Sequence, residues 1–415
     1  MKNKAWPLIL AVPLLGSVAP RAVAGPTYTA TRLSGAIYQL SADAGGYPVK
    51  VLASIGPDGI LLVDTGPAEL RDDLRVALAG LMPGVPRIII NTHSHVEHLG
   101  GNTAFGAGPL IIGHAALRAR LRSGPFLFDE LPDDALPRLT FVEEMRLHFN
   151  GEEIRLVPFP GAHDDSDVVV WFTGSKIAAV GGVCNGRHFP SVDGETGDVT
   201  RYPDVVARLI ALLPPDVLLV PGHGENGTLD DARAFHDMLV QTAAVIRAGL
   251  AAQKDAPTLE REDVLARWKA YEIAYADRSY WVRALVKGYG PGREARPRPW
   301  EQLFRAWKQG GIEAVRARYA WIKANEGQSW LLDDKLLFSI GYRLLQRGLP
   351  DARAFFQMSL DQFPKGSYAF AAHELIGDLQ RSEGDLEGAR ASYRRALELQ
   401  PGDPGVSAKL EALGR

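Results

Sequence analysis

The segment that most limits how this chain can fold is an apolar run followed at once by histidines. Residues 88–90 are three isoleucines, and the next eight residues read Asn-Thr-His-Ser-His-Val-Glu-His. In an extended backbone, residues two apart point the same way, so His93 and His95 can bind one ion together. Imidazole nitrogen is a good zinc ligand, and three such donors leave a fourth position open for water. The sequence therefore predicts a buried strand that ends in a metal-binding loop.

Two further histidines stand in equivalent settings. His163 lies shortly before the apolar run 168–172, and His223 directly follows the apolar run 217–220 and the pair Pro-Gly. Loops at strand ends are where sheet scaffolds usually carry their functional side chains. We expect both histidines to join the same site.

The first part of the chain alternates strand-like and helix-like patterns. Short runs rich in Val and Ile, bounded by Gly, Pro, Asp or Asn, predict strands at residues 36–40, 49–55, 60–63, 88–90, 110–112, 153–157, 168–172, 177–180 and 217–220. Helical periodicity predicts helices at residues 68–81, 115–121, 202–213 and 229–252. Residues 56–59 and the pair Asn150-Gly151 are typical of hairpin turns. Adjacent strands and helix-linked strands together indicate an α/β fold with mixed sheets covered by helices.

The strand signal disappears after residue 252. Residues 259–287 are predicted to be helical, residues 288–299 contain three prolines and three glycines and are typical of a linker, and the chain from Trp300 onward is predicted to be entirely helical. The predicted domains are residues 25–252, a helical segment and linker at 253–299, and a helical domain at 300–415.

A repeat is visible in this helical part. Small residues, aromatics and prolines recur at tetratricopeptide spacing, at Gly377, Ala389, Tyr393, Ala396 and Pro401 and, one unit earlier, at Ala352, Phe356 and Pro364. Small residues let the two helices of a unit touch, and the aromatic ring fills the groove between them. This pattern predicts a tetratricopeptide-like tail with a protein partner; a generic pair of helical hairpins is the alternative.

The N-terminus is typical of a secretory signal. Lys2 and Lys4 precede an apolar stretch that two prolines interrupt, and Ala-Val-Ala at 22–24 is a small-x-small cleavage pattern. We therefore expect residues 1–24 to be removed, the mature chain to be periplasmic or secreted, and no membrane span to remain. A net charge of −3 gives no basic field for nucleic acid, and the single cysteine, Cys184, excludes a disulfide within the chain.

These motifs resemble those of the metallo-β-lactamase superfamily over residues 28–250. The matching positions, in order, are Asp64-Thr65-Gly66, then His93, His95 and His98, then His163, and finally His223. The resemblance implies a sandwich of two mixed β-sheets with helices outside. It also implies one zinc on His93, His95 and His163, and a second on Glu97, His98 and His223.

Two departures from the family pattern affect the second metal. The carboxylate is Glu97 where the family has aspartate, and Gly182 stands where the family has a bridging aspartate. Metal–oxygen distances are held to ~0.2 Å, so a longer side chain fits badly. We expect one firm zinc and a weak or absent second. Cys184 lies two residues past the lost aspartate and is either a replacement ligand or a buried, inert thiol.

The resemblance implies a zinc-dependent hydrolase that attacks a carbonyl with metal-bound hydroxide. Glu97 would orient water or move a proton, and His98 and His223 would polarise or protonate the leaving group. Ester, lactone, thioester and β-lactam substrates remain open. The alternative is a binding scaffold that kept the fold, lost the chemistry and acts through its tail. An iron dioxygenase is disfavoured, because the resemblance implies that iron dioxygenases on this fold need the aspartate that Gly182 replaces.

Three other residues are candidates for smaller roles. Asp64 is expected to fix the loop geometry behind the ligands. His188 lies on a loop that should border the site, where it could contact substrate, and His114 is expected to be structural or to face the surface.

Overall fold

The computed structural model describes residues 28–43, 48–123, 131–192, 196–273, 276–290, 298–346 and 348–414. The predicted signal at 1–24 lies outside the described residues, as does most of the predicted linker. In the described part of the chain, no helix is long and apolar enough to cross a membrane.

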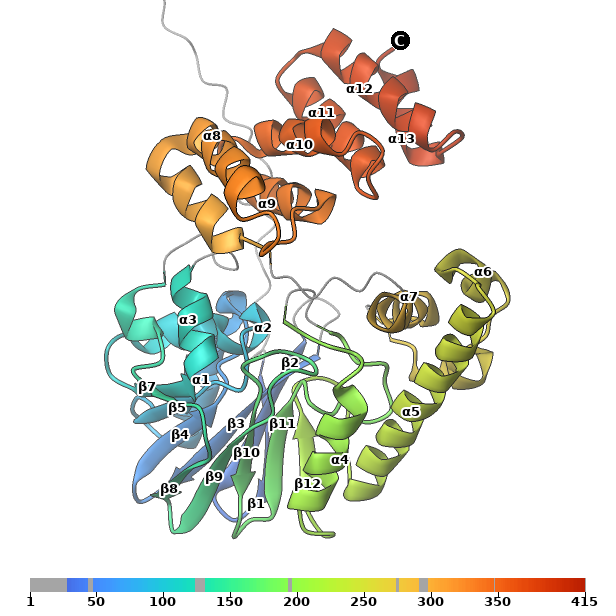
Figure 1. The fold of residues 1–415 in the computed structure, drawn as a ribbon. Coiled ribbons are helices and arrows are strands. Elements are labelled where there is room, and N and C mark those ends of the chain that lie inside the picture. Colours follow the sequence, from blue (N-terminus) through green and yellow to red (C-terminus); the bar gives the residue numbers. More distant parts are fainter. Residues whose placement is uncertain are drawn as a thin grey trace, which may run out of the picture.

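The first sheet holds seven strands in chain order (Figure 1). They are β1 (Thr29–Ser34), β2 (Ile37–Asp43), β3 (Pro48–Gly56), β4 (Gly59–Val63), β5 (Ile88–Ile90), β6 (Leu110–His114) and β7 (Leu139–Phe141). The strands β1 to β4 are antiparallel, and β4 to β7 are parallel. Gly56 pairs with Gly59 across the β3–β4 turn, which confirms the predicted hairpin.

The second sheet has the order β12-β11-β10-β9-β8. Its strands are β8 (Met145–Phe149), β9 (Glu152–Pro158), β10 (Val168–Phe172), β11 (Ile177–Gly181) and β12 (Leu218–Pro221). Only the β11–β12 pair is parallel. Asn150 and Gly151 have φ of 50° and 84°, the left-handed conformation that a tight hairpin needs, and this confirms the second predicted turn.

The two sheets face each other across an apolar core to which both contribute, with Leu61 and Ile90 on one side and Val170 and Ile177 on the other. The outer face of the first sheet packs on α1 (Arg71–Leu81). The outer face of the second packs on α4 (Tyr202–Leu212) and α5 (Leu229–Ala251). Two mixed sheets between helical layers confirm the predicted fold class.

Shorter helices complete the body. They are η1 (Ala68–Leu70), α2 (Val96–Leu99), η2 (Gly100–Phe105), α3 (Ala115–Ser123), η3 (Asp133–Ala135), α6 (Ala256–Arg261), η4 (Ala266–Tyr271) and α7 (Arg278–Tyr289). The predicted helical stretch 259–287 is therefore broken into three pieces. Trp268 and Trp281, in η4 and α7, are buried in the same core as α5. This segment thus packs on the sandwich, and α7 continues two residues into the predicted linker.

The tail is entirely helical where it is described. It contains α8 (Trp300–Asn325), α9 (Asp334–Gln346), α10 (Ala352–Gln362), α11 (Ala369–Ser382), α12 (Leu386–Leu399) and α13 (Pro404–Ala412) (Figure 1). A Cβ on Gly377 would lie 2.5 Å from the ring of Tyr393, and one on Gly341 would lie 2.9 Å from the ring of Phe356. The pairs α9–α10 and α11–α12 thus repeat one glycine-against-aromatic contact. This is consistent with a helical-repeat tail, and the tetratricopeptide assignment stays a prediction.

Candidate metal centre

Three of the predicted ligands form one group. His93 and His95 follow β5, and His163 lies in the loop between β9 and β10. One ligand atom from each lies within 4.8 Å of the others. The ring centroids are 4.8 Å apart for His93–His95, 4.7 Å for His93–His163 and 4.6 Å for His95–His163. The fold therefore gathers donors that are 70 residues apart in the sequence.

Hydrogen bonds orient two of these rings. His163 Nδ1 lies 3.1 Å from Asp167 Oδ1, and a carboxylate accepts, so Nδ1 carries the proton. The Thr92 hydroxyl donates to Asp64 Oδ2 at 2.8 Å and is left to accept from His93 Nδ1 at 2.9 Å. In both rings the lone pair is then on Nε2, the arrangement that metal-binding histidines usually show.

The charge state of His93 also suits a metal ligand. Burial, and then the neighbouring rings of His98, His163, His95 and His223, hold the pKa of His93 well below its usual value. The imidazole is therefore neutral at neutral pH, and neutral imidazole is the form that binds a metal.

Glu97, His98 and His223 form a second group, again with ligand atoms within 4.8 Å of one another. His98 lies on α2 and places Nδ1 3.0 Å from Asp64 Oδ2, while His223 follows β12 and donates from Nδ1 to the Pro48 carbonyl at 2.8 Å. The two Nε2 atoms then face each other at 3.2 Å. Two lone pairs this close repel unless a cation, either a proton or a metal ion, lies with them. The second group therefore also attracts a cation.

Glu97 belongs to the second group and also lies close to a ligand of the first. Its Oε1 is 3.4 Å from His95 Nδ1 and 3.7 Å from His223 Nε2. Burial alone would raise the pKa of Glu97, but the neighbouring imidazoles of His223, His95 and His98 outweigh it and hold the pKa below its usual range. Glu97 is thus ionised at neutral pH and can bind a cation or accept a proton.

Three side chains of the two groups are partly exposed to solvent. The side chains of His95, Glu97 and His223 are 20%, 28% and 14% exposed, whereas His93 and His98 are 1% exposed as whole residues. A substrate would reach the metal groups across these three side chains.

Comparison with known proteins agrees with this geometry. A family model described as the metallo-beta-lactamase superfamily matches residues 49–223. Metallo-beta-lactamase domain-containing protein 1 of Rattus norvegicus is 38% identical over 193 residues, which cover 44% of this chain and 68% of that protein. The chain belongs to the metallo-β-lactamase superfamily.

Two more distant likenesses were found. The protein of the same name from Homo sapiens is 30% identical over 172 residues, covering 40% of this chain and 58% of that protein. A solved metallo-beta-lactamase from Pontibacter korlensis superposes with a TM-score of 0.46 at 19% identity, over 51% of this chain and 99% of that one.

Asp64 lies behind both groups of this metallo-β-lactamase site. It is 3% exposed and has the left-handed φ of 62°. Its Oδ1 accepts from the Thr92 backbone N–H at 2.8 Å, and its Oδ2 faces both the Thr92 hydroxyl and His98. A strained backbone held this firmly is typical of functional sites. Its contacts are those of a residue that fixes the loop, as the sequence predicts.

Gly182, at the place of the family's bridging aspartate, has no room for a side chain. A Cβ there would lie 2.2 Å from His163 Nδ1. The Tyr202 hydroxyl donates to the Gly182 carbonyl at 2.6 Å and holds this backbone in place. The His163 ring thus lies directly against Gly182.

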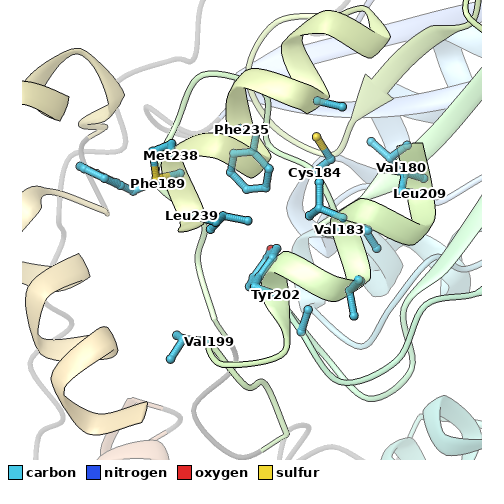
Figure 2. Close-up of a cluster of buried hydrophobic side chains, with 14 of the residues drawn as sticks. Val180, Val183, Cys184, Phe189, Val199, Tyr202, Leu209, Phe235, Met238 and Leu239 are labelled. Atoms are coloured by element: carbon cyan, nitrogen blue, oxygen red, sulfur yellow. The ribbon is translucent and has the colours of Figure 1, made fainter. Parts of the chain in front are cut away.

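Cys184 belongs to neither metal group and lies in an apolar cluster (Figure 2). It is 2% exposed and belongs to the apolar cluster that includes Val183, Tyr202 and Phe235. Burial raises the pKa of the thiol to about 12. Of the two alternatives for Cys184, the structure favours the buried, inert thiol.

The two other candidate histidines, His114 and His188, differ in position. His114 is 9% exposed at the end of β6, and its Nδ1 accepts from the Ala116 backbone N–H at 3.3 Å, so its role is structural. His188 packs beside the His223 loop, 2.9 Å from where a Cβ on Gly224 would lie. It therefore borders the site, as expected.

Sequence reasoning missed a buried charged group beside the histidines. Arg120, 8% exposed on α3, contacts Ser94, Asp164 and Asp165. The available signal was the position of these three residues directly after His93 and His163. Nothing in the sequence pairs them with an arginine from another element.

Proposed function

We propose that this chain is a zinc-dependent hydrolase of the metallo-β-lactamase superfamily that acts on a carbonyl group of a small-molecule substrate. The observation that carries the proposal is the three-histidine group, in which His93 and His163 donate from Nδ1 to Thr92 and Asp167 and so leave Nε2 free to bind. Neutral, oriented and converging imidazoles are the donor set that zinc prefers.

The proposed role of each residue follows from its position in the site. His93, His95 and His163 would hold the ion, which when bound lowers the pKa of water and polarises a carbonyl oxygen. Glu97, ionised and exposed to the opening, would accept a proton from water. His98 and His223 lie in the same group as Glu97 and would polarise or protonate the leaving group.

We propose that the second group, Glu97, His98 and His223, binds metal weakly. Its two histidine nitrogens attract a cation, but the carboxylate that would bridge both ions is missing, and the His163 ring leaves no room at Gly182 for one.

The test is metal content and turnover in the wild type and His95→Ala. The purified chain should retain about one zinc and hydrolyse at least one member of a panel of esters, lactones, thioesters and β-lactams, and His95→Ala should lose both. His236→Ala, at a histidine on α5 outside both metal groups, is the control and should keep both. Full activity in His95→Ala would refute the hydrolase, and two tightly bound zinc ions would refute the one-site proposal.

A binding scaffold that acts through the helical tail is the second candidate, favoured by the closed position at Gly182. Zinc-free protein that still binds a protein partner would support it over the hydrolase. For location, we propose cleavage after Ala24 and export to the periplasm or beyond. N-terminal sequencing of the exported chain tests this, and a mature chain that begins at Met1 would refute it.

A further inference from the structure

The metal site as described leaves one buried arginine without a function. Arg120 lies on α3, which contributes no metal ligand, yet its side chain is only 7% exposed and reaches the loops that carry three ligands. We propose that Arg120 is a positioning residue that fixes the distance between the His93–His95 loop and the His163 loop. This inference rests on the proposed metal-dependent function and names what assembles its site.

Arg120 joins the two loops directly. Its Nη1 donates to Ser94 Oγ at 2.5 Å and to Asp164 Oδ2 at 2.8 Å, and its Nη2 donates to Asp165 Oδ1. Ser94 Oγ also donates to Asp164 Oδ2 at 2.5 Å. Ser94 stands between His93 and His95, so this network, which we call the Arg120 clamp, connects both halves of the three-histidine group.

The clamp extends from Asp164 to the His163 ring. The Asp164 backbone N–H donates to Asp167 Oδ2 at 2.7 Å, and Asp167 Oδ1 faces His163 Nδ1 at 3.1 Å. A shift of Asp164 would therefore move the carboxylate that orients His163. Such partners behind the ligands typically contribute 10–100-fold to metal affinity.

The two buried charges of the clamp, Arg120 and Asp164, are paired with each other. Asp164 is fully buried, and burial alone would raise its pKa, but Arg120, His163 and hydrogen bonds from Ser166 and Ser94 hold the pKa below its usual value. The other carboxylate oxygen, Oδ1, accepts from the Ser166 backbone N–H and hydroxyl, both at 2.5 Å. Because burying a pair of charges offsets most of their attraction, the gain from this pair lies in geometry more than in stability.

Only arginine fits this arrangement. A planar guanidinium presents two nitrogens in fixed directions and can bind Asp164 and Asp165 at once, whereas a lysine ammonium is a point charge on a flexible stem. The clamp therefore predicts one outcome when the positive charge is lost, and a different one when the charge is kept but the two fixed nitrogens of the guanidinium are lost.

The experiment compares Arg120→Gln and Arg120→Lys with the wild type in the full-length chain. Three quantities are measured: the zinc dissociation constant by competition with a chromophoric chelator, the visible absorption of the cobalt(II)-substituted protein, and thermal unfolding of the metal-free protein. Arg298→Gln is the matched control, since Arg298 is an arginine with a 10% exposed side chain that pairs with Asp333 in the tail.

We expect Arg120→Gln to weaken zinc binding about 10- to 100-fold and to alter the cobalt spectrum. In zinc affinity and in the cobalt spectrum, Arg120→Lys should fall between Arg120→Gln and the wild type. Arg298→Gln should match the wild type in both of these quantities. Wild-type affinity and spectrum in Arg120→Gln would overturn the clamp. If Arg120→Gln fails to fold, Arg120→Lys is the deciding variant. Wild-type zinc affinity and cobalt spectrum in Arg120→Lys would overturn the role of the two guanidinium nitrogens.

The outcome also separates this inference from the proposed function. A wild-type chain that binds no zinc refutes the metal-dependent hydrolase itself. A wild type that binds zinc, together with unaffected Arg120 variants, refutes only the clamp.

Discussion

At the scale of single residues, Gly182 lacks the metal-binding side chain found in the family and also leaves no space in which one could be restored. The sequence predicts a weakened second site because an aspartate is missing there. The structure adds that the His163 ring fills the space in which any side chain would lie. A member of the three-histidine group thus packs where the second metal's ligand would be.

Gly182→Asp should therefore fail to create a second tight metal site. The added Cβ would lie 2.2 Å from His163 Nδ1, so the ring must move, which should weaken the first site and destabilise the fold by about 1–3 kcal/mol. Metal stoichiometry and thermal unfolding measure both effects. The control is Gly80→Asp, where nothing lies within 4 Å of the new Cβ. Two tightly bound zinc ions in Gly182→Asp would contradict the prediction.

Lys50 is a second residue whose contribution to stability depends on its surroundings, because these set the pKa of its amine. It lies on β3, donates to Asn226 Oδ1 at 2.8 Å, and burial, opposed in part by Glu225, lowers its pKa from 10.5 to about 8. Below pH 8 the folded protein carries a poorly solvated charge. As the pH rises from 8 to 10.5, the folded state loses this proton before the unfolded state does, so stability increases.

Lys50→Met should lack this pH-dependent increase. The difference in unfolding free energy between wild type and variant should change by at most about 3 kcal/mol between pH 7 and pH 10.5, less any screening by solvent at the partly exposed amine. Denaturant unfolding across this range measures it, with Lys176→Met, at an exposed lysine, as the control for loss of a lysine. The same pH-dependent increase in Lys50→Met would show that another group causes it.

At the scale of elements, the predicted strands were those whose short runs are rich in apolar residues. β5 and β10 have the bounds that the sequence predicts, because buried strands in the middle of a sheet need continuous apolar residues. The strands β1, β7 and β8 were missed. β1 and β7 lie at the edges of the first sheet and β8 at an edge of the second, and most of their residues are exposed or half-buried. Edge strands pair on one side only, so their sequences carry a weaker pattern.

In the tail, contact between paired helices depends on single glycines. Gly377→Leu should separate α11 from α12, because its Cβ would lie 2.5 Å from the Tyr393 ring, at a cost of about 1–3 kcal/mol. Circular dichroism during heating should show an earlier loss of helix, while zinc content stays unchanged. Glu387→Leu introduces the same residue at an 87% exposed side chain on α12 and serves as the control. Equal unfolding of the two variants would argue against the glycine contact.

At the scale of the whole molecule, the sandwich and the tail have separate apolar cores. Among the described residues, no hydrophobic cluster combines residues up to 290 with residues from 298 onward. All six candidate ligands belong to the sandwich. Metal binding should therefore stabilise one part of the chain and leave the other unchanged.

Calorimetry with zinc and with a chelator tests this separation. Zinc at 100 times its dissociation constant should stabilise the sandwich by about 2.7 kcal/mol and raise only its transition. The tail transition, identified by its shift in Gly377→Leu, should stay in place. A single transition that moves as a whole with zinc would show that the two parts unfold together.

The sequence by itself determined the strand patterns and the motif spacings, because these are local and survive without knowledge of contacts, and the family resemblance that they carry implied the two mixed sheets and the six candidate ligands. Only the tertiary structure decided which residues surround those ligands. Arg120 beside Ser94 and Asp164, the His163 ring over Gly182 and the burial of Cys184 all depend on segments that folding brings together. Such contacts are set by the packing of whole elements, which no short stretch of sequence records.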